Sequence, residues 1–134
     1  MSFRHRVRVY WEDTDAGGIV FYANYLKFFE RARTEWLRSL GIAQSRLREE
    51  TGGIFVVGAT SVRYLRPARL DDELLVTATL ESAGRASLII AQQALAYDGA
   101  VLCEGEIRIG WVDAATLKPG RMPAMILDAL SNSK

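Results

Sequence analysis

One stretch decides the fold: residues 24–40 have the sequence NYLKFFERARTEWLRSL. Its apolar residues recur mostly every three or four positions, which is the period of an α-helix with one apolar face. These residues are Leu26, Phe29, Ala32, Trp36, Leu37 and Leu40. Gly41 follows directly and is a natural helix stop. The pattern therefore predicts one amphipathic helix of roughly five turns.

Strand-like segments flank this helix on both sides. One covers residues 7–11, and four follow the helix over residues 54–64, 74–82, 87–97 and 101–112. Short turns such as Asp98-Gly99 link most of these segments, and short hairpin turns join antiparallel neighbours. Short helices are expected over residues 44–50 and 125–130. We therefore predict an α+β fold, in which the long helix buries its apolar face on an antiparallel sheet of about five strands.

The predicted architecture leaves part of the sheet uncovered. One helix covers one face only, and the edge strands keep unpaired backbone groups. Self-association would cover these surfaces, so we expect an oligomer. The chain of 134 residues contains no linker, repeat or low-complexity tract, so we expect a single domain over residues 1–134.

Overall charge and rare residue types argue against several classes of function. The formal net charge of +1 gives no electrostatic basis for nucleic-acid binding, and no stretch approaches the roughly 20 apolar residues that span a membrane. The N-terminus has no apolar run of signal-peptide length, and the single cysteine, Cys103, can form no internal disulfide. With His5 as the only histidine, a zinc site or a histidine-based triad is poorly supported. We expect a cytoplasmic protein without metal or cofactor.

Two acids and two glycines precede the long helix, in residues 13–18 with the sequence DTDAGG. Glycine lets the backbone approach a ligand closely, and the first turn of a helix carries N–H groups without intrahelical partners. Such an end can polarise a carbonyl group, while a nearby carboxylate attacks it or activates a water molecule. The loop is therefore a candidate hydrolase site. Ordinary helix capping also accounts for these residues, so the loop alone leaves both interpretations open.

Three segments closely resemble acyl-CoA thioesterases of the hotdog fold: residues 10–25 (YWEDTDAGGIVFYANY), 28–33 (FFERAR) and 62–72 (VRYLRPARLDD). The branch contains 4-hydroxybenzoyl-CoA thioesterase and the Tol-Pal-associated thioesterase, and the nearer likeness is to the latter. The resemblance implies a hotdog fold, in which a strongly curved antiparallel sheet wraps the long helix. It also implies that two protomers join their sheets, that the sites lie at the dimer interface, and that a homodimer or homotetramer forms.

The resemblance implies roles for individual residues of the loop. Asp15 matches the catalytic carboxylate, which acts as a nucleophile or as a general base, and Asp13 matches an acid whose role is more often structural. The peptide N–H of Tyr22 matches the donor that polarises the thioester carbonyl, with Gly18 and Val20 nearby in the loop. At Tyr22 the Tol-Pal-associated members commonly have a histidine, whereas the 4-hydroxybenzoyl-CoA enzyme resembles this chain in having tyrosine. The backbone N–H is the same in either case.

Further residues are candidates for binding the substrate. Tyr25 is expected to wall the acyl pocket, and its alternative is a core aromatic near the helix start. Arg85 and Ser87 match a region that contacts the nucleotide of CoA in related thioesterases. Arg63, Arg66 and Arg69 are further candidates for the phosphates, and the alternative for each arginine is a solvated surface charge.

We therefore expect an acyl-CoA thioesterase that produces a carboxylate and free CoA, with an acyl-carrier protein as a further partner. One alternative is a non-catalytic module that binds acyl-CoA or acyl-carrier protein, because the fold alone does not separate binding from hydrolysis. Another is a scaffold protein of the cell-envelope machinery. The dehydratase variant of the fold usually needs a histidine near this helix, which the chain lacks.

Overall fold

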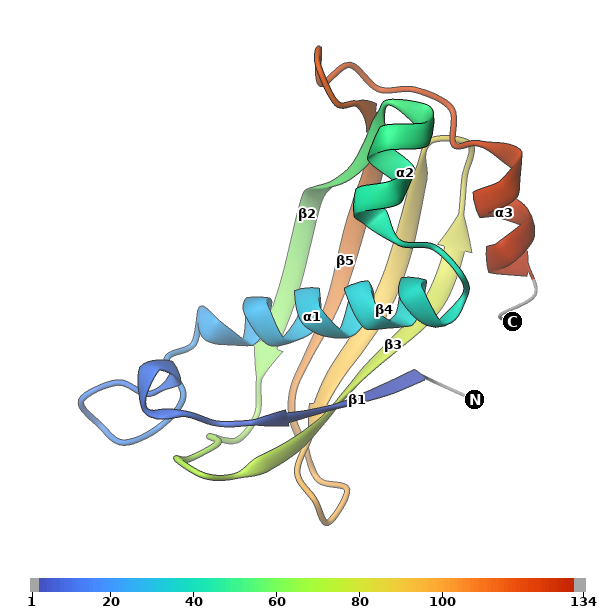
Figure 1. Ribbon diagram of the computed structural model, residues 1–134. Coiled ribbons are helices and arrows are strands. Elements are labelled where there is room, and N and C mark those ends of the chain that lie inside the picture. Colours follow the sequence, from blue (N-terminus) through green and yellow to red (C-terminus); the bar gives the residue numbers. More distant parts are fainter. Residues whose placement is uncertain (1–2, 132–134) are drawn as a thin grey trace.

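The computed structural model describes residues 3–131 and shows a curved antiparallel sheet with one long helix across it (Figure 1). The strands are β1 (Phe3–Arg8), β2 (Gly53–Tyr64), β3 (Glu73–Ala83), β4 (Ser87–Leu95) and β5 (Val101–Asp113). The helices are α1 (Asn24–Ser39), α2 (Gln44–Thr51) and α3 (Ala124–Ser131), and a short 3-10 helix, η1, covers Trp11–Asp13. The predicted α+β fold, with a long helix on an antiparallel sheet of about five strands, is confirmed.

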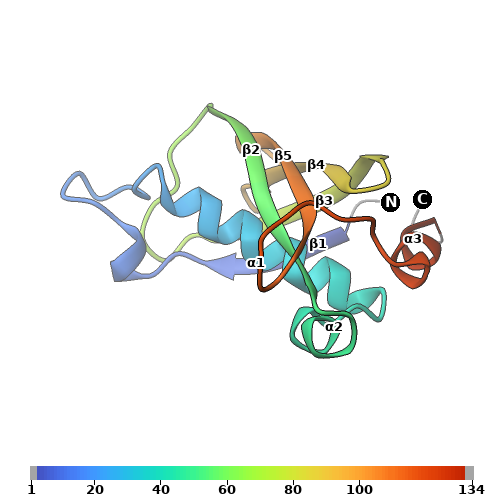
Figure 2. The same cartoon turned by 90° about the horizontal axis from the view of Figure 1, so that it is seen from above.

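The order of the strands makes β1 and β2 the two edges of the sheet. The order is β1-β3-β4-β5-β2, and every neighbouring pair is antiparallel. Register shifts between Val57 and Ala59 in β2, and between Leu80 and Ser82 in β3, bend these strands. The bends let the sheet curve around α1, which Figure 2 shows crossing beneath the strands.

The buried face of α1 differs from the predicted face near its start. Phe28, Phe29, Ala32, Trp36 and Leu37 are buried, together with Tyr25. The predicted face included Leu26, but the structure leaves this side chain exposed and buries Phe28 instead, because the sheet covers the side of the helix on which Tyr25, Phe28 and Phe29 lie. Phe29 packs over Gly105 of β5, where a Cβ atom would come within 3.1 Å of the ring.

Two predicted strands end earlier than expected because local hydrogen bonds turn the chain. The predicted strand over residues 7–11 is β1, which ends at Arg8, and η1 begins at Trp11. There the Asp13 carboxylate accepts the N–H of Tyr10 at 2.8 Å, which closes a tight turn. The predicted strand over residues 87–97 is β4, and it ends at Leu95. The predicted Asp98-Gly99 turn follows, with Gly99 at a positive φ of 93°.

A buried polar link fixes α1 on the sheet. The Arg33 guanidinium donates to Gln92 Oε1 at 2.9 Å, and Gln92 Nε2 donates to the carbonyl oxygens of Phe29 and Thr77 at 2.9 and 3.1 Å. Burial lowers the pKa of Arg33, because removing the cation from water disfavours its charged form. One glutamine thus joins the middle of α1 to β3 and β4.

Candidate active site

Hydrogen bonds fold the loop before α1 into a tight hairpin-like shape. The Asp15 N–H donates to the Ile19 carbonyl at 2.9 Å, and the Gly18 N–H donates to the Asp15 carbonyl at 3.0 Å. Gly18 has a positive φ of 81°, a conformation that glycine adopts without steric cost. Thr14 and Val20 form an isolated antiparallel bridge across the loop. The two arms of the loop therefore carry Asp15 on one side and residues 19–22 on the other.

Asp13 holds this loop against the start of α1. Its side chain is buried and accepts the Tyr10 N–H, as described above. Its carbonyl oxygen accepts the Phe21 N–H at 2.9 Å and the side-chain amide of Asn24 at 2.8 Å. Both the carboxylate and the carbonyl oxygen of Asp13 are thus hydrogen-bonded to neighbouring residues. Burial also keeps the carboxylate away from a ligand in solvent.

Asp15 has a different environment, although it lies two positions away. Its side chain is exposed, and Oδ1 accepts the Gly17 N–H at 2.8 Å. The second carboxylate oxygen has no hydrogen-bond partner among residues 3–131. One oxygen therefore orients the group, and the other can act on a ligand.

The other arm of the loop offers a backbone donor at Tyr22. The N–H groups of Gly18 and Val20 donate to the carbonyl oxygens of Asp15 and Ala68, whereas the Tyr22 N–H has no acceptor within the described part of the chain. It lies just before α1, whose N-cap residue, Ala23, offers no side-chain cap. No acid occupies the first turn of α1. This end of the helix therefore keeps its positive partial charge available to a carbonyl oxygen.

Aromatic side chains surround a cavity of about 290 Å³ beside this loop. The Tyr25 hydroxyl accepts the Ala68 N–H at 3.2 Å, and burial raises the pKa of this phenol. The cavity is lined by Ile19, Val20, Tyr22, Tyr25, Tyr64, Leu65, Arg66 and Pro67. Sequence reasoning did not name Ile19 as a site candidate. It also did not name Tyr64, Leu65 and Pro67, and it named Arg66 only as a candidate for the phosphates. The likeness of residues 62–72 to the thioesterase branch was the signal that could have pointed to them.

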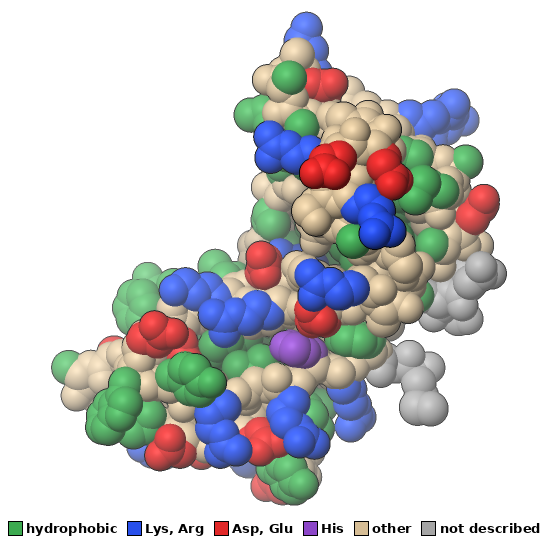
Figure 3. Space-filling view, in the orientation of Figure 1, with side chains coloured by type: hydrophobic (Ala, Val, Ile, Leu, Met, Phe, Trp, Pro, Cys, Tyr) green, Lys and Arg blue, Asp and Glu red, His purple; other side chains and the backbone are tan. Residues whose placement is uncertain are grey.

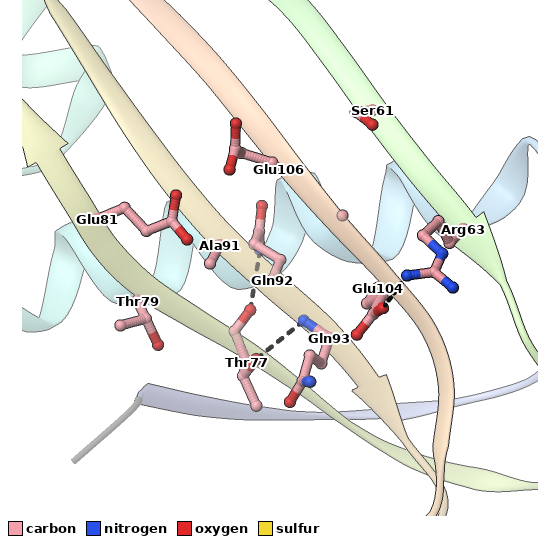
Figure 4. Close-up of a pocket in the computed structure, with 11 residues that line it drawn as sticks. Ser61, Arg63, Thr77, Thr79, Glu81, Ala91, Gln92, Gln93, Glu104 and Glu106 are labelled. Atoms are coloured by element: carbon pink, nitrogen blue, oxygen red, sulfur yellow. Dashed lines mark hydrogen bonds and ion pairs between the residues drawn. The ribbon is translucent and has the colours of Figure 1, made fainter.

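Among the arginines predicted to contact the phosphates, Arg66 lines this cavity and Arg69 forms a backbone bridge with Ile19 of the loop. The other predicted binding residues lie away from the loop within one chain. Arg63 extends from the sheet face opposite α1 and contacts Glu104 at 3.5 Å, in a polar hollow of about 440 Å³ (Figure 4). Arg85 and Ser87 lie at the turn between β3 and β4, which is the opposite end of β3 from the loop. The structure therefore brings together Asp15, Gly18, Val20, Tyr22 and Tyr25, but not Arg63, Arg85 and Ser87.

The remaining candidate nucleophiles and ligands form no site. Cys103 is fully buried, and burial raises its pKa to about 12, so the thiol stays protonated at neutral pH. His5 lies on β1, opposite Val76 of β3. Residues 3–131 contain no group of three or more His, Cys, Asp or Glu side chains that could hold a metal ion. Asp15 therefore stays the candidate reactive side chain of this region.

The surface charge and the helices can also be compared with the features of nucleic-acid-binding and membrane-spanning proteins. Figure 3 shows Lys and Arg side chains interspersed with Asp and Glu side chains over α1 and α2, so this face has no large patch of one charge. Within residues 3–131, no helix has both the length and the apolar character needed to cross a membrane.

The sequence of the chain matches known thioesterases over nearly its whole length. The family model of the thioesterase-like superfamily matches residues 9–130. The acyl-CoA thioesterase YbgC of Haemophilus influenzae is 41% identical over 99% of this chain and 97% of its own length. The acyl-CoA thioester hydrolase YbgC of Escherichia coli O6:H1 is 42% identical over 93% of this chain and 92% of its own.

A solved structure extends the comparison to the fold. The 1,4-dihydroxy-2-naphthoyl-CoA thioesterase from Synechocystis superimposes with a TM-score of 0.89, at 20% identity, over 98% of this chain and 97% of that one. At this identity the likeness shows the shared fold alone, which is the hotdog fold. The sequence matches cover nearly the whole chain and show more than a common fold. The chain belongs to the thioesterase-like superfamily.

Proposed function

We propose that this chain, an acyl-CoA thioester hydrolase by its family membership, cleaves its substrate with Asp15 and the backbone at the start of α1. One observation carries the proposal: Asp15 has one oriented and one free carboxylate oxygen, on the same loop as a Tyr22 N–H that has no acceptor among residues 3–131. The pair supplies a nucleophile or base and a donor for the oxygen on which negative charge develops. The products are a carboxylate and free CoA.

Two routes use the same groups. As a general base, Asp15 takes a proton from water while the water oxygen attacks the thioester carbon. As a nucleophile, the Asp15 oxygen attacks that carbon itself, and water then cleaves the resulting anhydride. In both routes the carbon–sulfur bond breaks, and the CoA thiolate leaves and takes up a proton. The Tyr22 N–H stabilises the charged carbonyl oxygen in either route.

The substrate lies along the loop in this proposal. Gly18 and Val20 let the thioester approach the backbone, and Tyr25 walls the acyl pocket. Arg63, Arg85 and Ser87 contact the CoA phosphates and nucleotide, and the separation of these residues from Asp15 within one chain fits contributions from two protomers. An acyl-carrier protein is a further partner that can deliver the acyl group as a thioester.

We further propose a homodimer or homotetramer that acts in the cytoplasm, built from a single domain over residues 1–134. The free edge of β2 and a groove between β2 and α1 support self-association. This groove encloses about 530 Å³ and exposes Leu26 and Val57, which are apolar. A second copy would remove both side chains and the unpaired edge from water. The only cysteine is a buried thiol, which fits a reducing compartment.

The replacement Asp15→Asn tests the proposed mechanism. It keeps the shape of the side chain but removes the negative charge, so we expect kcat to fall at least about a hundredfold. The measurement is release of free CoA thiol from a panel of acyl-CoAs. Asp128→Asn is the matched control, because Asp128 lies on α3 and should leave the rate unchanged.

The same panel separates hydrolysis from simple binding. If the parent chain binds acyl-CoA in a calorimeter but releases no thiol, the non-catalytic binding module is correct. If Asp15→Asn hydrolyses every substrate as fast as the parent chain, the role given to Asp15 is wrong.

A further inference from the structure

The aromatic cavity beside the loop has a second wall, formed by the segment that follows β2. Leu65 and Arg66 both donate their N–H groups to the Leu102 carbonyl of β5, at 2.9 and 3.0 Å. Ala68 then accepts the Val20 N–H at 2.8 Å, which ties the segment to the loop that carries Asp15. The wall is therefore held from both ends, and its position relative to the loop is fixed.

Tyr64, the last residue of β2, stands where this wall begins and also lines the cavity. Its ring lies 5.7 Å from the ring of Tyr25 and 6.0 Å from that of Tyr22, where the two rings meet edge-to-face at 88°. Its backbone pairs with Cys103 in the β2–β5 ladder, so the side chain starts from a rigid strand. Although its neighbours hold it on two sides, Tyr64 remains 47% exposed and Tyr22 62% exposed. Two aromatic side chains thus leave apolar surface open to the cavity.

The cavity adjoins the reacting groups. Ile19 lines it, and the Ile19 carbonyl accepts the N–H of Asp15. Tyr22 also lines it, and its backbone carries the free N–H described above. An acyl group whose thioester carbonyl lies at the Tyr22 N–H can therefore place its substituent in this cavity. The polar hollow on the other face of the sheet contains Glu81, Glu104 and Glu106 and does not offer an apolar alternative (Figure 4).

The volume of the cavity and the side chains that line it limit which acyl group can bind there. The volume of about 290 Å³ lies just below the roughly 300–1,000 Å³ that ligand pockets usually enclose. It therefore fits a compact group better than a long alkyl chain. Aromatic side chains prefer edge-to-face or offset partners, so the open surfaces of Tyr22 and Tyr64 favour a ring.

We propose that Tyr64 is a specificity-determining residue, and that its ring selects a compact acyl group, preferably an aromatic one, for hydrolysis beside Asp15. The inference rests on the proposed thioesterase function and adds the substrate class and the residue that selects it. Tyr64 acts through its ring surface and the space that it occupies. Its hydroxyl group has no hydrogen-bond partner among residues 3–131.

Three replacements of Tyr64 test the proposal, with kcat/KM measured for benzoyl-CoA, hexanoyl-CoA and palmitoyl-CoA. In the parent chain we expect benzoyl-CoA to be preferred over palmitoyl-CoA. Tyr64→Ala removes the ring and opens the cavity, so the ratio of benzoyl-CoA to palmitoyl-CoA should fall about tenfold. Tyr64→Phe keeps the ring and should keep the parent ratio. Tyr64→Trp narrows the cavity and should raise the preference for hexanoyl-CoA over palmitoyl-CoA.

Tyr97→Ala is the matched control, because Tyr97 is an exposed tyrosine in the β4–β5 hairpin that does not line the cavity. It should leave all three kcat/KM values unchanged. A general loss of stability would lower the three values together and would leave their ratios at the parent level. If Tyr64→Ala lowers all three kcat/KM values equally, or changes none of them, the proposal for Tyr64 is overturned.

A binding measurement separates this proposal from the proposed function. Calorimetry compares benzoyl-CoA with free CoA in the Asp15→Asn background, with and without Tyr64→Ala. We expect benzoyl-CoA to bind more tightly than free CoA. Tyr64→Ala should weaken the binding of benzoyl-CoA about tenfold and leave that of free CoA unchanged. A chain that hydrolyses nothing but shows this loss contradicts the thioesterase function and supports the acyl pocket. A chain that binds benzoyl-CoA and CoA equally contradicts the pocket, whatever its activity.

Discussion

Asp13 and Asp15 are chemically identical and lie two positions apart, yet the fold gives their carboxylates different surroundings. Asp13 is buried and accepts a backbone N–H, so it stabilises the turn before α1. Asp15 is exposed and keeps one oxygen free of partners among residues 3–131. The tight loop produces this division, because it buries the side chain of Asp13 and leaves that of Asp15 exposed to solvent. At this scale, the environment of a residue decides its role more than its type does.

Cys103 gives a second prediction at the residue scale, on the pH dependence of stability. Burial raises its pKa to about 12, from about 9 for an exposed thiol. The unfolded chain therefore loses this proton first as the pH rises, and the free energy of unfolding should decrease above about pH 9. Between pH 7 and pH 10 the thiol should account for a loss of about 1.4 kcal/mol. Urea unfolding at a series of pH values measures this loss.

Cys103→Ala is the matched variant for this prediction, because it removes the titrating group and keeps a small apolar side chain. We expect its free energy of unfolding to decrease less between pH 7 and pH 10, by about the same 1.4 kcal/mol. The pKa values of Tyr25 and Tyr64 are also raised, by burial, but phenols in the unfolded chain ionise near pH 10 and add little below it. Equal pH dependence in the two proteins would show that Cys103 does not titrate as described.

At the scale of the elements, the attachment of α1 to the sheet depends on one glutamine. Gln92 satisfies the Arg33 guanidinium and two carbonyl groups, and its side chain is almost fully buried. Gln92→Ala would leave a buried cation and the Phe29 carbonyl with fewer partners, so we expect a loss of about 3 kcal/mol in the free energy of unfolding. Chemical denaturation followed by circular dichroism measures this loss.

Gln93→Ala is the control at this scale. Gln93 is the next residue of β4, and its side chain points to the opposite face of the sheet, into the polar hollow (Figure 4). We expect a change within about 0.5 kcal/mol for this surface position. If the two variants lose equal stability, the link through Gln92 is not what holds α1 on the sheet.

At the scale of the whole molecule, β2 is an edge strand whose outer side is open to a partner. Eleven of the twelve residues of β2 pair with β5, and within residues 3–131 no strand pairs with its other side. Val57 beside the groove is 52% exposed. We expect a second copy to cover this region, so sedimentation should give two or four times the chain mass of 14.9 kDa. Val57→Lys would place a charge in the contact and should shift the protein toward the single-chain mass.

Met125→Lys is the control for this experiment. Met125 is an exposed apolar residue of α3, outside the groove between α1 and β2. It should leave the sedimentation coefficient unchanged. A single-chain mass for the parent protein at micromolar concentration would contradict the predicted oligomer, and an unchanged mass for Val57→Lys would move the contact away from the β2 edge.

The sequence determined the elements and their order, because these depend on local patterns. The apolar spacing over residues 24–40 predicted α1, and the Asp98-Gly99 pair predicted the turn between β4 and β5. Periodicity could not choose between Leu26 and Phe28 for the buried face, because which side of a helix is covered depends on where the sheet curves. The end of β1 was also missed, since the turn that follows it depends on the Asp13 carboxylate.

The sequence also indicated Asp15 and the start of α1, because two acids and two glycines before a helix are visible in one continuous stretch. Only the tertiary structure decided what stands around them. Among residues 3–131 it left the Tyr22 N–H without an acceptor, whereas the N–H groups of Gly18 and Val20 have one. It also brought Tyr64 from the far end of β2 against Tyr22. Such contacts join residues about forty positions apart, and they follow from how the strands pair and bend. No local pattern contains that information.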